Sequence, residues 1–209
     1  MGKHYYQTVI FDMDGTLTDS VPLITEAVAE VISHYHLPEQ TPQQLKRFVG
    51  PPLRIGFKQY LDLPEELLDE AVEVYRRYYR PRMTQVPLFA GVEELLRRLH
   101  SEGLKTAVAS SKLEELVRDI AEATGMSPYL DCVAGTQEKV GTSAENPADV
   151  ASPQLRRGKE GVIRYALQQL APSGGLGRAV MVGDRADDYQ AACNIGIDVI
   201  GVSWGCLLY

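Results

Sequence analysis

The chain lacks a long apolar run and a cysteine framework, and each absence narrows what it can be. No stretch approaches the roughly 18 consecutive apolar residues that span a bilayer, and Met1 to Gln7 contain no apolar signal-peptide core. The three cysteines, Cys132, Cys193 and Cys206, are scattered and form no Cys-x-x-Cys pair. The sequence therefore predicts neither a disulfide framework nor a zinc site. We expect a cytoplasmic protein with no membrane partner.

An excess of basic residues is also lacking. The chain has 21 lysines and arginines against 28 aspartates and glutamates, which gives a net charge of −7. This negative net charge does not indicate a surface that binds polyanions, so we expect no nucleic-acid partner. The length of 209 residues and the 44% of hydrophobic residues suit one ordinary globular domain, or a core that carries a smaller domain.

The predicted elements change character along the chain. An apolar strand is expected at about Thr8 to Phe11, and consecutive helices without a convincing strand follow from residue 20 to 82. Those helices are expected from Ser20-Val21-Pro22 to near Leu37, from Thr41-Pro42, over Leu53 to Leu61, and from Pro64 to Pro81. After Pro87 helices alternate with strands at 104–110, 132–134, 179–182 and 197–202. This order predicts an α/β fold, a parallel sheet with helices on both faces and a helical insert after the first strand.

Polar groups fall where the predicted strands end or helices begin. Asp12 and Asp14 follow the first strand, Ser110 follows the second, Lys159 opens a helix, and Asp184 follows the strand at 179–182. Parallel strands bring their carboxyl ends to one edge, so the groups at strand ends should converge. Read alone, Asp12 and Asp14 are equally compatible with a simple strand–turn junction.

Four segments resemble the motifs of the haloacid dehalogenase superfamily of phosphatases: Asp12-Met13-Asp14-Gly15-Thr16, Ser110, Lys159, and Gly183-Asp184-Arg185-Ala186-Asp187-Asp188. The stretches FVGPPL (48–53) and VIRYAL (162–167) are similar to its phosphoglycolate phosphatase-like members. The resemblance covers nearly the whole chain. It implies a Rossmann-like core of residues 1–18 and 84–209 and a small all-helical cap of residues 19–83.

The resemblance implies a role for each acid. Asp12 is expected to be the nucleophile that attacks phosphorus, and Asp14 the general acid and then the base. Mg²⁺ is expected to be bound by Asp12, the backbone carbonyl of Asp14, and Asp184, while Asp188 braces the metal shell. Asp187 is read as an acid in the first turn of a helix.

Phosphate binding is expected to involve the other polar groups of the motifs. Ser110 is also counted with the catalytic groups, and Gly15, Thr16 and Ser111 are expected to contribute contacts around the phosphate. On its own, Ser110 is more typical of a helix N-cap than of a ligand. Lys159 is the preferred active-site lysine, with Lys112 and Lys139 as competitors. Arg54 of the insert is a further candidate for contacting a substrate anion.

The function expected from this resemblance is a Mg²⁺-dependent phosphatase acting on a small phosphorylated metabolite, nominally phosphoglycolate, as a monomer or weak homodimer. A phosphoglucomutase of the same fold is the enzymatic alternative. A dehalogenase is disfavoured because Asp14 supplies the acid that a phosphate ester's leaving group needs. A non-catalytic phosphate- or partner-binding module is the alternative from another class. The intact Asp12, Asp14 and Asp184 argue against it.

Overall fold

Five parallel strands form one sheet at the centre of the computed structural model, which describes residues 5–137, 156, 158–171 and 177–205. The strands are β1 (Thr8–Phe11), β2 (Lys105–Leu113), β3 (Cys132–Thr136), β4 (Ala179–Gly183) and β5 (Asp198–Gly201). They lie in the order β3-β2-β1-β4-β5. Val9 of β1 pairs with Thr106 on one side and with Val180 on the other. The residue after β1 is therefore at the middle of the sheet's carboxyl edge.

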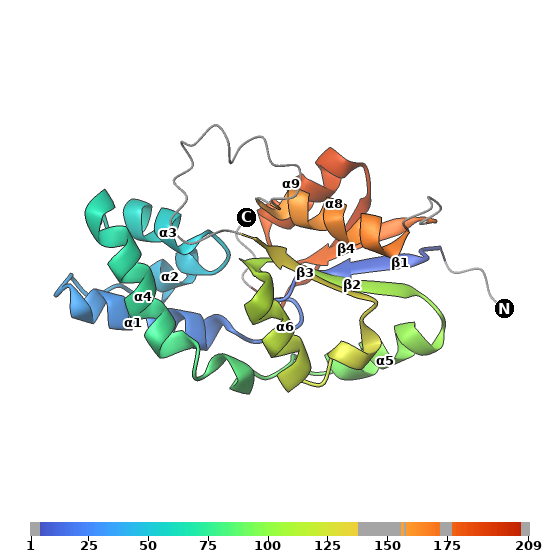
Figure 1. Cartoon of the computed structure of the whole chain (residues 1–209), viewed down its shortest axis with the longest axis horizontal. Coiled ribbons are helices and arrows are strands. Elements are labelled where there is room, and N and C mark those ends of the chain that lie inside the picture. Colours follow the sequence, from blue (N-terminus) through green and yellow to red (C-terminus); the bar gives the residue numbers. More distant parts are fainter. Residues whose placement is uncertain (1–4, 138–155, 157, 172–176, 206–209) are drawn as a thin grey trace.

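Helices cover both faces of the sheet, as the sequence predicted (Figure 1). They are α5 (Val92–Ser101), α6 (Glu114–Ala123), α8 (Gly158–Leu170) and α9 (Ala186–Ile195). Ile10 packs with Val162 on the α8 and α9 side, whereas Phe11 belongs to the apolar cluster that includes Leu96 and Val117. Successive residues of β1 thus enter opposite cores, and all four are buried. A strand covered on both faces explains the continuous apolar run.

The segment between β1 and α5 is helical and lies to one side of the sheet (Figure 1). It contains α1 (Val21–His34), α2 (Pro42–Leu45), α3 (Leu53–Tyr60) and α4 (Leu68–Tyr79), with short 3₁₀ turns η1 (Lys46–Phe48), η2 (Glu65–Leu67) and η3 (Met83–Gln85). We call residues 20–85 the helical insert. Its start and its type agree with the sequence prediction. The domain limits at residues 18/19 and 83/84 stay a prediction.

Local chemistry explains where these helices begin and end. Thr41 and Gln44 form a reciprocal capping box at the start of α2. Ser20 precedes α1, but its hydroxyl makes no capping hydrogen bond. The same helix ends at His34, not near Leu37, because the chain turns through a left-handed residue, His36, at φ 50°.

The second strand is longer than predicted. The sequence analysis ended it at Ser110, whereas β2 continues to Leu113 with a register shift between Ala109 and Leu113. Ser110 therefore lies within an irregular strand end, and the N-cap of α6 is Leu113. An irregularity of this type redirects side chains at a sheet edge.

Lys139, one of the competing lysines, lies outside the described residues, as does most of the polar segment 136–157. A short 3₁₀ turn, η4 (Ser127–Tyr129), precedes β3. None of the helices in the described part of the chain has the length and apolar character needed to cross a bilayer.

Candidate active site

Three carboxylates meet at the carboxyl edge of the sheet. Asp12 follows β1 and its backbone N–H donates to Val182 O at 2.9 Å, which continues the pairing with β4. Asp184 follows β4, and Asp188 lies in the first turn of α9. One ligand oxygen of each residue lies within 4.8 Å of the others, and all three residues are buried. The topology thus brings together acids separated by more than 170 positions.

This carboxylate cluster fits a divalent cation. Its donors are all oxygens, which is the ligand set that Mg²⁺ prefers. Asp12, Asp184 and Asp188 expose 4%, 0% and 1% of their surface. Three buried anions in contact need positive charge nearby, and the ion pairs of the described residues bring one lysine to two of them. Asp188 was expected in the metal shell, and one of its oxygens is part of the cluster.

Lys159 is that lysine. It is in the first turn of α8, and its Nζ lies 2.5 Å from Asp12 Oδ1 and 2.8 Å from Asp188 Oδ1. It also donates to the backbone carbonyl of Ala109 at 3.0 Å. The structure therefore places the preferred lysine of the sequence analysis directly on the expected nucleophile. Its catalytic role stays a prediction.

Burial and charge set the protonation of this pair. Burial raises the pKa of Asp12 to about 7, against the lowering influence of Lys159. Burial alone would lower the pKa of Lys159, but Asp12 and Asp188 raise it above its ordinary value. The raised pKa keeps Lys159 in its charged form near neutral pH. Asp12 gains and loses its proton near neutrality while no cation is bound.

A second lysine occupies the site, and the sequence analysis had treated it only as a competitor. Lys112 Nζ lies 3.2 Å from Asp14 Oδ2 and donates to the hydroxyl of Tyr79 at 2.7 Å. The lysine also lies over the Tyr79 ring, 4.4 Å from its centroid. Asp14 Oδ1 is buried without a hydrogen-bond partner among the described residues. Lys112 thus pairs one oxygen of the expected general acid and leaves the other oxygen open.

Tyr79 belongs to α4, so this contact joins the helical insert to the edge of the sheet. Lys112 could have been assigned to the site from its position two residues after Ser110. Tyr79 carried no such signal, because an aromatic residue at helical spacing is typical of a helix core. An ion pair at 3.1 Å between Arg80, the residue after α4, and Glu115 of α6 is a second link.

The loop after Asp14 packs closely against the carboxylate of Asp184. Gly15 has φ 82°, and a Cβ at this position would overlap the carboxylate of Asp184, so glycine is required there. The hydroxyl of Thr16 donates to Asp184 Oδ1 at 3.5 Å, and the Trp204 indole donates to Thr16 O at 3.1 Å. Both predicted loop residues therefore contact or border the carboxylate cluster.

The two serines differ in exposure. Ser110 is buried, and its Oγ accepts a hydrogen bond from the backbone N–H of Lys112 at 3.2 Å. Ser111 is partly buried, and its carbonyl accepts from the hydroxyl of Thr136 at 3.3 Å. These contacts shape the turn that carries Lys112 to Asp14. Phosphate binding by either serine stays a prediction.

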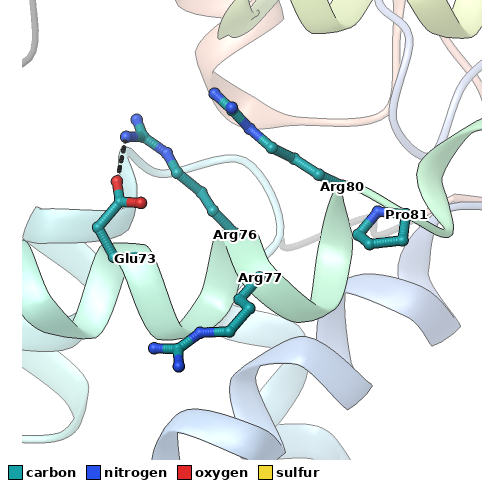
Figure 2. Close-up of a pocket in the computed structure, with 5 residues that line it drawn as sticks. All are labelled: Glu73, Arg76, Arg77, Arg80 and Pro81. Atoms are coloured by element: carbon teal, nitrogen blue, oxygen red, sulfur yellow. Dashed lines mark hydrogen bonds and ion pairs between the residues drawn. The ribbon is translucent and has the colours of Figure 1, made fainter.

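The structure does not bring Arg54 to the carboxylates. Its guanidinium is paired with Glu65 and Asp69 on the exposed surface of the helical insert. A hollow of about 470 Å³ on the same insert is lined by Glu73, Arg76, Arg77, Arg80 and Pro81 (Figure 2). Figure 2 shows Arg76 paired with Glu73 while Arg77 points away from them. None of these residues belongs to the carboxylate cluster, so the hollow is separate from it.

The fold and the cluster together define a class. It is an α/β fold with a cluster of aspartates at the carboxyl edge of a parallel sheet and a helical insert between the first two strands. The family follows directly. A model of the haloacid dehalogenase-like hydrolases matches residues 6–196, and the chain belongs to that family.

Relatives with names of their own agree on the family and differ in their activities. The chain is 35% identical to the tyrosine-protein kinase PtkA of Mycobacterium tuberculosis over 95% of its length, and it spans 62% of that relative. It is 32% identical to a 5'-nucleotidase of Pseudomonas aeruginosa, covering 96% of this chain and 84% of the relative. The crystal structure of a predicted phosphatase from Clostridium acetobutylicum superposes with a TM-score of 0.80 at 31% identity, covering 99% and 88% of the two chains.

Proposed function

We propose that this protein is a Mg²⁺-dependent phosphatase that hydrolyses a small phosphorylated metabolite through a phosphorylated Asp12. The observation that carries the proposal is the contact of a buried aspartate with Lys159 inside a three-carboxylate cluster. A second aspartate, Asp14, lies two residues further along the chain with one oxygen unpaired. The relatives support it, because the kinase and the nucleotidase both carry names that describe chemistry on phosphate groups.

The residues divide the reaction into two steps. In the first, an oxygen of Asp12 attacks phosphorus and forms a new O–P bond while the bond to the leaving oxygen breaks. Asp14 gives its proton to that leaving oxygen. In the second, water attacks phosphorus, Asp14 takes the water's proton, and the bond between Asp12 and phosphorus breaks to release phosphate. Both residues return to their starting states.

The surrounding charges serve these steps. Asp12, Asp184 and Asp188 would hold Mg²⁺, which, when bound, neutralises charge between the carboxylate and the phosphate. Lys159 contacts Asp12 and holds its oxygen in place. Lys112 pairs with Oδ2 of Asp14, which leaves Oδ1 as the oxygen free to face the leaving group. Tyr79 couples that arrangement to the helical insert, which would exclude bulk water when it closes over the substrate.

A screen of phosphorylated metabolites with Mg²⁺ tests this proposal. Release of inorganic phosphate is measured for the native protein and for Asp12→Asn, which keeps the size of the side chain. We expect phosphate release by the native protein and none by the variant. Isomerised sugar phosphate without free phosphate would identify the mutase instead. Binding without any turnover would identify the non-catalytic module.

A further inference from the structure

A second positive group is buried beside the carboxylate cluster and is not used by the mechanism. Arg185 directly follows Asp184, and its backbone N–H donates to Asp188 Oδ2 at 3.2 Å. Its side chain is only 11% exposed. The Nε and Nη1 atoms are buried and have no hydrogen-bond partner among the described residues. The Nη2 atom has one charged neighbour, Asp187 Oδ2, at 3.9 Å, which is too long for a hydrogen bond.

The guanidinium lies where the sheet edge meets the helical insert. Gly50, in the turn between η1 and α3, has φ 105°, and a Cβ at this position would overlap Cζ, Nε and Nη1 of Arg185. The backbone of the insert therefore rests directly on the guanidinium, and only glycine permits that approach. Arg185 is fixed between the two parts of the molecule, next to the residues that surround Asp12.

Such a group is costly to keep without an anion. Buried polar groups in proteins are normally hydrogen-bonded, and a buried charge is normally paired. Asp187 is 61% exposed and faces only Nη2, at 3.9 Å, so Nε and Nη1 keep no partner among the described residues. Arginine has a planar fork of donors that matches carboxylate and phosphate oxygens. The guanidinium of Arg185 therefore requires an anion, which would bind at the junction between the sheet and the insert.

We propose that Arg185 binds a second anionic group, a carboxylate or a phosphate, carried by the leaving group of the substrate. This inference rests on the proposed phosphatase function and narrows its substrate class to phosphate esters or anhydrides with two anionic ends. The reacting phosphate binds beside Asp12 and Lys159, and the leaving group extends toward the helical insert, where it contacts the guanidinium of Arg185. Arg185, not Arg54, is then the specificity-determining arginine.

Three test substrates distinguish a carboxylate from a phosphate as the second anionic group. Ethyl phosphate has a single anionic group, 2-phosphoglycolate adds a carboxylate at similar size, and inorganic pyrophosphate adds a phosphate. The measured quantity is kcat/KM for each two-anion substrate divided by kcat/KM for ethyl phosphate. We expect Arg185→Met to lower the ratio for at least one of them by about 10- to 100-fold, the usual effect of losing a charged hydrogen-bonding partner. The substrate whose ratio falls more identifies the second anion.

Two further variants keep the test decisive. Arg98→Met removes an arginine that is 73% exposed on α5 and should leave the ratios unchanged. Arg185→Lys keeps the charge without the fork and should give an intermediate ratio, and it carries the comparison if the methionine variant does not fold. If both ratios are unchanged in the Arg185 variants, even where kcat/KM falls equally on all three substrates, the assignment is overturned.

Failure of the proposed function looks different. In that case the native protein turns over none of the three compounds, ethyl phosphate included. Calorimetric titration with the same compounds then decides the inference. Tighter binding of 2-phosphoglycolate or pyrophosphate than of ethyl phosphate, lost in Arg185→Met, supports the anion site without catalysis. Equal binding of all three by the native protein and the variant overturns it.

Discussion

The carboxylate cluster predicts that removing one charge makes the metal-free protein more stable. Asp184→Asn keeps the shape of a fully buried side chain and removes one of three neighbouring negative charges. Two unit charges 4.8 Å apart repel by about 3.5 kcal/mol at an effective dielectric of 20. Asp184 has two such neighbours, Asp12 and Asp188. Lys159 pairs with both of those neighbours and compensates part of their charge, so we take about half of the repulsion, about 3 kcal/mol, as relieved.

Thermal unfolding in EDTA at pH 8 measures this effect, because the pKa of Asp12 is raised to about 7 and its carboxyl is ionised at that pH. For a chain of this length, 1 kcal/mol corresponds to about 2–4 °C in Tm. We therefore expect Asp184→Asn to melt about 6–12 °C above the native protein without metal. With Mg²⁺ at 100 times its Kd the native protein should gain about 2.7 kcal/mol, whereas the variant, lacking a ligand, should gain little.

Asp62→Asn is the matched control, since Asp62 is exposed, has φ 54°, which asparagine tolerates, and lies in the helical insert. Its Tm should match that of the native protein under both conditions. An Asp184→Asn variant that melts at or below the native protein in EDTA would refute the repulsion argument. Equal stabilisation of both proteins by Mg²⁺ would show that the cation does not bind at Asp184.

Further predictions concern the lysines, the insert and pH. Lys159→Ala should lower the rate of phosphate release by about 10²–10³-fold, the size of effect seen when one preorganised charged partner is removed. Lys105→Ala, which removes a lysine from an exposed ion pair, should leave the rate unchanged. Equal rates in the two variants would remove Lys159 from the mechanism. Tyr79→Phe removes the hydroxyl bonded to Lys112, so kcat should fall by about 3- to 10-fold with little change in Tm; a large fall in Tm with unchanged kcat would make the contact purely structural. Because burial raises the pKa of Asp12 to about 7, its contribution to metal-free stability is present at pH 4 and is lost as the pH rises through 7. Mg²⁺ competes with that proton, so the rise in Tm on adding Mg²⁺ should grow from pH 5 to 7 and level off above; a rise that is constant with pH would show that Asp12 is not a ligand.

The sheet and the position of its acids could be predicted because they depend on local patterns. A continuous apolar run ending in Asp12 specifies a buried strand, and the alternation after residue 87 specifies parallel neighbours. Once the strands are parallel, the topology alone brings Asp184 to Asp12. Lys159 was preferred because of the family resemblance, and it lies beside Asp12 and Asp188. An ammonium at a helix start is disfavoured unless an anion pairs with it, which is consistent with this position.

The contacts between the insert and the sheet could not be read from the sequence. Whether Arg54 or Arg185 faces the junction depends on how the insert is seated, and no short-range pattern encodes that orientation. The pairing of Lys112 with Asp14 depends on the irregular end of β2, where four positions from Ala109 to Leu113 run against two on β3 and the direction of the side chains changes. Tyr79 looked like a core residue and is one, but its hydroxyl also reaches the site.

The hydrogen bond from the indole of Trp204 to the loop after Asp14 provides an intrinsic fluorescence probe of that loop. Trp204 is the single tryptophan of the chain, it is 54% exposed, and its N–H is tied to the carbonyl of Thr16. Emission from this ring therefore depends on the position of the loop that borders Asp184. A shift in intrinsic fluorescence on adding a cation or a ligand would register occupancy of the reaction centre without any label.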